Sequence, residues 1–390
     1  MKIAFVIEHF NPRYGGQQVY MRDFAEFLVK RGHEVSFFTQ DSNVKNVNLS
    51  INIINVPALA KLMRWSQWLS FLTQVKHKIQ QGNFDVVMGT GISAGINVYQ
   101  PHGGVSKASH RQNRLLTNRF HRFLKGLSNA ISPKHLLANR IERNIFTDKR
   151  VKYVAISQMV KRHMQEFYKI DETQLELVYN GVDVERFNPH SASQKSQSKT
   201  KLSLKEDVVV FSLVAHNFKL KGLKEIIDVV DLLRVQHDNF IVLIAGNGKT
   251  KNYKKMIAKK SLEKHFKFLG SVDDPELIYS ATDVYLQPTW YDPCSLVVLE
   301  AMAAGLPVIS TSFNGASELI ESGVNGYVIE KPDSINEFYE ALNALMDCEH
   351  RKVLGKKARL SVEGLTHEKN FSRMEEVFQG CVEEKQKRTL

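Results

Sequence analysis

Short apolar runs alternate with amphipathic segments over the first 180 residues of the chain. The run at 2–7 predicts a strand, and the apolar side chains of 17–31 recur at the spacing of a helix that Gly32 ends. The other strands predicted in this half are 34–39, 51–56, 85–89, 151–156 and 175–179. Because strands and helices alternate, the sequence predicts a parallel sheet with helices on both of its faces.

The same alternation begins again beyond residue 207, where the predicted strands are 208–214, 240–245, 267–269, 284–287 and 308–310. Residues 190–206 are rich in Ser, Lys and Gln, which predicts a solvated linker. We therefore expect a first Rossmann-like domain at 1–189, a second at 207–366, and a C-terminal helix at 367–390 that crosses back to the first. The predicted fold class is α/β, with two doubly wound domains that face each other across a cleft.

One segment, 105–150, interrupts this alternation and lacks any strand pattern. It holds eleven Lys and Arg residues against two acidic ones, a net charge of +9. Apolar residues recur every three or four positions among these cations, as in a basic amphipathic helix. The segment is predicted to bind an anionic membrane surface through five cations: Arg111, Arg114, Arg119, Arg122 and Lys125.

Two other interpretations of the basic segment stay open. A solvated helical hairpin could cover apolar surface with its long Lys and Arg stems. Arginines interleaved with phenylalanines could also bind RNA by stacking. The stripe of Leu and Phe beside the cations favours a lipid headgroup surface, so we expect no nucleic acid as a partner.

The composition is that of an ordinary globular protein with an excess of positive charge. The chain has 390 residues, 43% hydrophobic and 24% charged, with 53 Lys and Arg against 41 Asp and Glu, a net charge of +12. Wholesale disorder and a disulfide scaffold are excluded, and the charge indicates an anionic partner. The cysteines Cys294, Cys348 and Cys381 suggest neither a disulfide framework nor a zinc site, which fits a cytoplasmic protein. No run of about 20 apolar residues predicts a membrane span.

Ligands of doubly wound sheets bind at the carboxyl ends of the strands. Gly15 and Gly16 follow the first predicted strand, where a glycine pair is either a simple turn or a close approach of backbone to a diphosphate. Lys219 and Lys221 follow the first strand of the second half, where they either begin an exposed helix or contact phosphate oxygens.

Two carboxylates eight residues apart flank the start of an apolar helix after the strand at 284–287. Asp292 precedes this helix and Glu300 lies two turns within it. The amides of Ser295, Leu296 and Val297 form the helix start and are suited to a phosphate. Because a buried carboxylate needs a hydrogen-bonding partner, either ligand hydroxyls or a structural group must satisfy Glu300.

The stretch Asp292 to Glu300 resembles the Glu-x7-Glu donor-binding motif of family 4 glycosyltransferases, which have the GT-B fold. The resemblance extends over nearly the whole chain, through the Gly15-Gly16 loop, Asn180-Gly181-Val182-Asp183 with Phe187, Lys221-Gly222 and Gly305-Leu306-Pro307-Val308. It implies an N-terminal acceptor-binding domain, a C-terminal nucleotide-sugar-binding domain, and sugar transfer with retention of anomeric configuration and without a metal. It also implies no cofactor, with a nucleotide sugar, expected to be a UDP-sugar, as the substrate.

Two further stretches resemble bacterial lipopolysaccharide-core glycosyltransferases, Tyr99-Gln100-Pro101-His102-Gly103-Gly104-Val105 and Trp290-Tyr291-Asp292-Pro293-Cys294-Ser295-Leu296. These relatives hold a basic insert on membrane, which implies a lipid-linked glycan as acceptor at the inner membrane surface. An inactive scaffold protein of the same family is the alternative in which no sugar is transferred.

The resemblance also implies a role for each matching residue. Glu300 would bind the nucleotide ribose, Lys221 would pair with the diphosphate, and Gly16 would lend its backbone to it. Asp292 would hold the donor sugar, His102 would lie near the anomeric centre, and Gly246 and Gly248 would lie near the base. The family's first Glu is Asp292 here, one methylene shorter, and a family Arg is replaced by His216, with Lys219 nearby.

Overall fold

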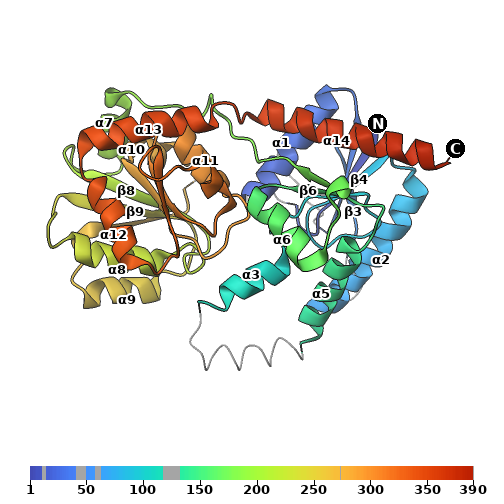
Figure 1. Ribbon diagram of the computed structural model, residues 1–390, viewed down its shortest axis with the longest axis horizontal. Helices are drawn as coiled ribbons and strands as arrows, with labels where there is room; N and C mark the ends of the chain where they lie inside the picture. Colours follow the sequence, from blue (N-terminus) through green and yellow to red (C-terminus); the bar gives the residue numbers. More distant parts are fainter. Residues whose placement is uncertain (11–14, 41–49, 58–62, 117–131, 273, 390) are drawn as a thin grey trace. The chain divides into compact units, whose positions relative to one another are not determined.

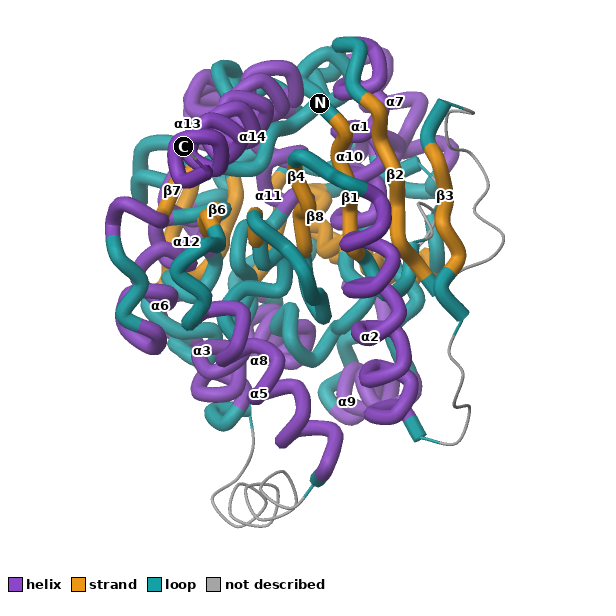
Figure 2. The backbone as a smooth tube through the Cα atoms, turned by 90° about the vertical axis from the view of Figure 1, so that its right-hand side faces the viewer, coloured by secondary structure: helices purple, strands orange, loops and turns teal. Residues whose placement is uncertain are grey.

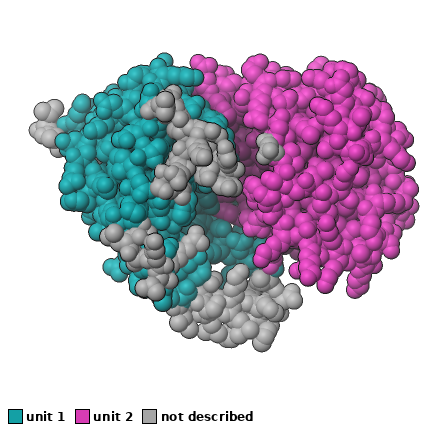
Figure 3. Space-filling view, turned by 180° about the vertical axis from the view of Figure 1, so that it is seen from behind, with its two compact units in different colours: residues 1–179, 370–390 teal, residues 180–369 magenta. Residues whose placement is uncertain are grey.

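In the computed structural model, the residues described are 1–10, 15–40, 50–57, 63–116, 132–272 and 274–389. Contacts divide the chain into two units, drawn in different colours in Figure 3. Unit 1 comprises 1–179 and 370–390, and unit 2 comprises 180–369. The second unit thus begins at Asn180, ten residues before the boundary predicted from composition.

The sheet of unit 1 has seven parallel strands in the order β3-β2-β1-β4-β5-β6-β7. Figure 2 shows β3, β2, β1 and β4 side by side. They are β1 Lys2–Val6, β2 Glu34–Thr39, β3 Asn52–Asn55, β4 Val86–Gly89, β5 Val98–Tyr99, β6 Lys152–Ala155 and β7 Leu175–Leu177. Its helices are α1 Gly16–Lys30, α2 Arg64–Gly82, α3 Ser106–Asn113, α5 Pro133–Phe146, α6 Gln158–Tyr168 and most of α14 His367–Thr389 (Figure 1).

Alternation along β1 explains how helices come to cover both faces of this sheet. Ile3 and Phe5 pack with apolar residues of α1 and α14, whereas Ala4 and Val6 pack with α2. Successive side chains of a strand point to opposite faces, so a run that is apolar throughout indicates burial on both faces. The C-terminal helix α14 contributes Phe371, Met374, Val377 and Phe378 to the first of these cores.

The sheet of unit 2 has six parallel strands in the order β10-β9-β8-β11-β12-β13. They are β8 Val209–Val214, β9 Phe240–Ala245, β10 Phe266–Gly270, β11 Val284–Gln287, β12 Val308–Thr311 and β13 Gly326–Ile329. Its helices are α7 Ala192–Lys201, α8 Leu223–Leu233, α9 Lys251–Lys259, α10 Glu276–Ala281, α11 Leu296–Ala303, α12 Ile335–Ala344 and α13 Cys348–Val362. Two doubly wound α/β sheets confirm the predicted fold class.

The segment predicted as a solvated linker, 190–206, instead contains helix α7 of unit 2, which corrects that prediction. Ser191 and Gln194 form a capping box at its start, with each side chain bonded to the backbone of the other. Lys199 is buried, and its Nζ donates to the carbonyl oxygens of Glu206 and Val208 at 2.7 and 2.9 Å. A polar composition is therefore compatible with an ordered helix when lysine stems lie along the protein surface.

The basic segment, 105–150, contains α3 and α5, and its residues 117–131 lie outside the described part of the chain. Helix α5 is anchored in unit 1, because Ile141, Ile145 and Phe146 are buried. Two lysines of the segment cover aromatic rings: Lys107 Nζ lies 4.3 Å from the ring centre of Tyr168, and Lys134 Nζ lies 5.7 Å from that of Trp68. Contacts of this kind are expected if the segment is a helical hairpin that covers apolar surface with its lysine stems.

Candidate active site

Each sheet has one point at which the strand order reverses, and loops leave there from neighbouring strands. In unit 1 this point lies between β1 and β4, and in unit 2 it lies between β8 and β11. Crevices at such switch points are where doubly wound sheets bind ligands. The loops that matter are therefore those that follow these four strands.

The switch point of unit 2 brings together a cation and a carboxylate. Lys221, in the loop after β8, forms an ion pair with Asp292, in the loop after β11. Gln287, the last residue of β11, donates from Nε2 to Asp292 Oδ2 at 3.1 Å and to Ser295 Oγ at 2.6 Å. Asp292, Gln287 and Ser295 are buried, so this is a fixed polar network rather than a mobile surface pair.

Gly222 lets the two loops approach closely enough to form this network. Its φ is +79°, and a Cβ atom there would lie 2.1 Å from the carbonyl oxygen of Pro288. The backbone N–H of Trp290 and the hydroxyl of Thr289 both donate to the Leu220 carbonyl, at 2.8 and 3.0 Å. Any larger residue at 222 would push the loop after β8 away from the loop after β11.

The start of helix α11 lies beside this network. Asn314 orients it, because its Oδ1 accepts from the N–H of Ser295 at 3.3 Å and from the N–H of Ala316 at 3.1 Å. The Ser295 side chain makes no capping hydrogen bond to the helix. The amides of Leu296 and Val297 are therefore available to an anion at the positive end of the helix dipole.

Glu300 lies further along α11 and is half-buried. The hydroxyl of Tyr279, a residue of α10, donates to Glu300 Oε2 at 2.7 Å. Burial raises the pKa of Glu300, while the Tyr279 hydrogen bond and the charge of Arg186 act in the opposite direction. No hydrogen bond to Oε1 occurs within the described residues, which leaves one oxygen able to accept from ligand hydroxyls.

Arg186 adds a cation on this side of α11. Its guanidinium stacks 4.9 Å from the ring centre of Phe187 and donates to Asp274 Oδ1 at 3.0 Å. Phe187 in turn meets the ring of Tyr279 edge-on at 5.7 Å. Arg186 and Phe187 belong to the stretch that begins at Asn180, so this stretch supports the tyrosine that holds Glu300.

The glycines after β9 pack against the loop that follows β8. A Cβ atom on Gly246, whose φ is +126°, would lie 1.8 Å from the carbonyl oxygen of Ala215. One on Gly248 would lie 2.3 Å from the ring of Phe218. Close packing, against backbone at Gly246 and against an aromatic ring at Gly248, therefore favours both glycines irrespective of a ligand. Lys219, also predicted to contact the donor, is exposed.

In unit 1, the predicted glycine pair begins α1 next to the switch point. Gly15 is the residue before the helix, with φ +147°, and Gly16 is its first residue. Gln17 Nε2 donates to Thr90 Oγ1 at 2.7 Å and so connects the start of α1 with the loop after β4. No acidic residue occupies the first turn of α1, which suits an anion there.

His102 lies in the loop after β5 and is half-buried. Its Nε2 is 2.9 Å from Gln100 Oε1, and its ring centre is 4.9 Å from that of Tyr20. Burial lowers the pKa of His102 to about 4. The imidazole is therefore neutral at physiological pH and carries a hydrogen on one nitrogen and a lone pair on the other.

The five predicted membrane-binding cations are described only in part. Arg111 is exposed and pairs with Glu166 of α6 at 3.0 Å. Arg114 is the C-cap residue of α3, while Arg119, Arg122 and Lys125 lie outside the described residues. Across the described ranges, no helix combines the length and apolarity that crossing a bilayer requires.

The sequence predicted Lys221, Asp292 and Glu300 as site residues but did not predict the groups that bond to them. Gln287, Asn314 and Tyr279 were missed, although each bonds directly to a predicted residue. The position of Gln287 at the end of a predicted strand was a usable signal. The sequence gives no such signal for Tyr279, because it lies on α10 and an aromatic residue on a short helix usually indicates core packing.

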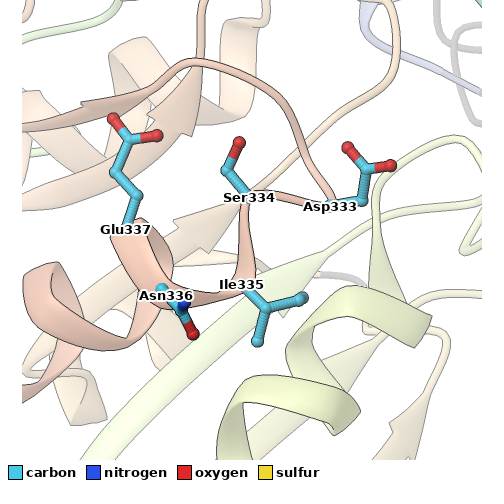
Figure 4. A pocket seen from close by; sticks show the side chains of 5 residues that line it. All are labelled: Asp333, Ser334, Ile335, Asn336 and Glu337. Carbon is cyan, nitrogen blue, oxygen red and sulfur yellow. The ribbon is translucent and has the colours of Figure 1, made fainter.

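A hollow at the start of α12 contains none of the predicted site residues (Figure 4). It is lined by Asp333, Ser334, Ile335, Asn336 and Glu337. The carboxylate of Glu337 already accepts from the Glu330 N–H at 2.9 Å. Two acidic residues in its lining disfavour a diphosphate there.

Two doubly wound sheets, each with predicted site residues in the loops at its switch point, define the chain as a two-domain protein of the GT-B class. Residues 14–186 match the family described as Glycosyltransferase Family 4, and residues 194–361 match that described as Glycosyl transferases group 1. The chain belongs to the family 4 glycosyltransferases. It is a glycosyltransferase that uses a nucleotide sugar, in a retaining, metal-independent family.

Individual relatives are distant but cover the chain broadly. An uncharacterised glycosyltransferase of Methanocaldococcus jannaschii is 25% identical, with 86% of this chain and 87% of that protein covered. The lipopolysaccharide glucosyltransferase WaaG of Escherichia coli is 22% identical, with 88% of each covered. A crystal structure of a WaaG superposes with a TM-score of 0.84 at 20% identity, covering 97% of this chain and all of that one. A glycosyltransferase HepE of Anabaena, crystallised with UDP-glucose, has a TM-score of 0.74 at 17% identity and covers 97% and 100%.

Proposed function

We propose that the protein transfers a hexose from a UDP-sugar to a lipopolysaccharide-core or other lipid-linked glycan at the inner membrane surface. The observation that carries the donor half of this proposal is the network of Lys221, Asp292, Gln287 and Ser295 at the switch point of unit 2. The similarity to WaaG, a lipopolysaccharide glucosyltransferase, and to HepE, which was crystallised with UDP-glucose, supports the choice of donor and acceptor.

In the proposed reaction the bond between the anomeric carbon and the diphosphate breaks, and its electron pair leaves with the nucleotide. Lys221 and the amides of Leu296 and Val297 would stabilise the negative charge on the leaving diphosphate, a task in which one donor can contribute on the order of a hundredfold in rate. Gly16 would lend a further amide. Oε1 of Glu300 would accept from the ribose hydroxyls, because Oε2 is occupied by Tyr279.

Asp292 would hold hydroxyls of the donor sugar while it stays paired with Lys221. Gln287 already donates to one of its oxygens, Oδ2, so the other is the one expected to accept from the sugar. The acceptor hydroxyl would then form its bond to the anomeric carbon on the face that the diphosphate leaves, which gives retention.

The decisive experiment is to incubate the protein with a panel of UDP-sugars and a lipid-linked core acceptor, and to determine the mass and linkage of the product. We expect one hexose to be added in α- or β-linkage matching that of the donor. The Asp292→Asn variant is the matched control, since it keeps the volume of the side chain and removes its charge. If no sugar of the panel is transferred by the wild type, the enzyme assignment of donor and acceptor is wrong.

The membrane part is tested by replacing Arg111, Arg114, Arg119, Arg122 and Lys125 with Gln and sedimenting the protein with anionic vesicles. Each cation near such a surface contributes about 1 kcal/mol, so five removals should release the protein. The matched control replaces five exposed lysines of unit 2 around α9, Lys249, Lys251, Lys254, Lys255 and Lys259. Equal sedimentation of both variants and wild type would contradict membrane binding through this segment.

A further inference from the structure

A chain of polar side chains runs through the interior of unit 1 and ends at His102. It contains Tyr20 of α1, Gln100 after β5 and Asn370 of α14. Tyr20, Gln100 and Asn370 are buried, with relative exposures of 2%, 0% and 6%. These residues are separated by up to 350 positions in the sequence, and the reaction proposed above uses none of them.

A backbone carbonyl fixes the direction of the hydrogen bonds at the far end of this chain. Asn370 Nδ2 lies against the backbone carbonyl oxygen of Tyr179, and a carbonyl oxygen can only accept. Asn370 must therefore point its NH2 group at Tyr179 and its Oδ1 at Tyr20. The Tyr20 hydroxyl donates to that Oδ1 at 2.9 Å, which uses its single hydrogen.

The same reasoning continues from Tyr20 to the histidine. Because the Tyr20 hydrogen is used, its oxygen can only accept from the neighbouring Gln100 side chain. Met374 fixes the orientation of the Gln100 amide, because Nε2 donates at 3.6 Å to its Sδ, a thioether sulfur that can only accept. Gln100 Oε1 is then the atom that faces His102 Nε2 at 2.9 Å, and this amide oxygen can only accept.

We propose that Asn370, Tyr20 and Gln100 are positioning residues that hold His102 as its Nε2–H tautomer. His102 Nδ1 is thereby presented as a hydrogen-bond acceptor, selecting a sugar hydroxyl over an anionic group. This inference rests on the proposed function for the identity of the ligand, but not for the state of the histidine. Among the described residues, no hydrogen bond is made to Nδ1, so this atom is the one left for a ligand.

The consequence for specificity follows from the lone pair on Nδ1. A hydroxyl can donate its hydrogen to this nitrogen. A carboxylate or phosphate oxygen has no hydrogen to donate, so it and Nδ1 would both be acceptors and would repel each other. A site made to hydrogen-bond a hydroxyl discriminates strongly against a group that cannot make the bond. Fixing the tautomer in advance means that the ligand does not have to reorient the ring when it binds.

The state of His102 can be measured directly in the ligand-free protein by nitrogen NMR of imidazole-labelled histidine, with the His102→Gln variant assigning its signals. We expect a pyridine-type Nδ1 and a pyrrole-type Nε2 at neutral pH in the wild type. Tyr20→Phe keeps the aromatic ring and removes the hydroxyl, so it should produce a mixture of both tautomers. A wild-type spectrum with the hydrogen on Nδ1 would overturn the proposal.

Tyr153→Phe is the matched control. Tyr153 is equally buried in unit 1, and its hydroxyl donates to backbone carbonyls of Ile145 and Asp148 instead of to the chain that ends at His102. This variant should leave the His102 signals unchanged. If Tyr20→Phe also leaves them unchanged, the positioning role is refuted even though the protein is folded.

Activity provides a second arm that separates this inference from the proposed function. The test compares two UDP-sugars that are identical except at one position, where one sugar carries a hydroxyl group and the other a carboxylate. The wild type should prefer the hydroxyl, and Tyr20→Phe should lower kcat/KM for it about fivefold, the effect of one hydrogen bond. Gln100→Glu should make both His102 nitrogens donors and reduce the preference. A preference that survives unchanged in Gln100→Glu would refute the selecting role, whereas no turnover with any sugar would refute the proposed function and leave the NMR result standing.

Discussion

The ligand loops of the two units are built from opposite kinds of polar chemistry. At the switch point of unit 2, formal charges dominate: Lys221 pairs with Asp292, and Glu300 lies on the helix that begins beside them. In unit 1, the polar groups behind His102 are a tyrosine and two amides, none of which is charged at neutral pH. The first arrangement is suited to a dianionic diphosphate, and the second to the hydroxyls of a neutral sugar.

The two arrangements also differ in how their geometry is fixed. A buried ion pair is costly to assemble unless further hydrogen bonds satisfy it, and Gln287 supplies such a bond to Asp292 at 3.1 Å. A neutral chain avoids the cost of burying charge, but every member must be satisfied for it to define one orientation. Removing a charge from unit 2 should therefore affect turnover much more than removing a hydroxyl from unit 1.

The largest effect is expected for Glu300→Ala. Two charge-assisted hydrogen bonds to ribose hydroxyls would be lost, at about 1.5–3 kcal/mol each, so turnover should fall on the order of a thousandfold. Nucleotide binding, measured by calorimetry, should weaken as well. Tyr279→Phe is the comparison, because it removes only the support of Glu300 Oε2 and should cost far less. Transfer and donor hydrolysis near wild-type rates in Glu300→Ala would exclude Glu300 from ribose binding.

Lys221→Ala should lower kcat about a hundredfold, because the leaving diphosphate loses a fixed cation. Lys224→Ala is the matched control. Lys224 lies three residues further along, in the first turn of α8, where it is exposed and pairs with Asp228 at the surface. A chelator should leave the wild-type rate unchanged. A loss in Lys224→Ala as large as that in Lys221→Ala would show that general surface charge, and not this cation, drives turnover.

Most of the fold was predictable because both sheets are parallel and buried on both faces. Such strands are nearly continuous apolar runs bounded by loops: β9 is apolar throughout, β1 is apolar after Lys2, and β8 is interrupted only by Ser212. The strands that were missed carry little of this signal. β5 has only two residues, Val98 and Tyr99, and β13 begins at Gly326. Helix α7 was missed because capping and lysine stems stabilise it, rather than an apolar face.

The candidate sites of the two units also differ in how far the sequence could predict them. Asp292, Ser295 and Glu300 could be predicted because they lie within nine consecutive residues, where spacing along one helix start carries the information. The chain that ends at His102 could not, because Tyr20, Gln100 and Asn370 are joined only by the packing of α1 and α14 on the sheet of unit 1. Hydrogen bonds between such distant residues leave no periodic pattern in the sequence.

A smaller effect is expected for Gln287→Leu, which retains side-chain bulk but leaves Asp292 and Ser295 without their shared donor. Turnover should fall about tenfold through loss of their orientation, since one hydrogen bond to a charged group is removed. The affinity for free nucleotide should change little, because the Gln287 side chain bonds to Asp292 and Ser295, whereas Glu300 is held by Tyr279. If nucleotide affinity falls as much as turnover, Gln287 acts on the whole loop and not on these two side chains.

The smallest effect concerns stability against pH, where the two units should respond with opposite sign. Burial lowers the pKa of His102 to about 4 from an ordinary value near 6.5, so the unfolded chain binds more protons than the folded one between these values. Stability from this group is present above pH 6.5 and is lost as the pH falls toward 4. Burial raises the pKa of Glu300, so its contribution is present at low pH and is lost as the pH rises above the ordinary carboxyl range.

Urea unfolding from pH 4 to 7 should therefore show His102→Gln losing less stability than wild type on acidification. Glu300→Gln should gain most over wild type at pH 7, because the amide oxygen still accepts from Tyr279 without a buried charge. Parallel curves for wild type and both variants would mean that neither group titrates differently in the folded state, and the contrast between a neutral and a charged site would then not extend to stability.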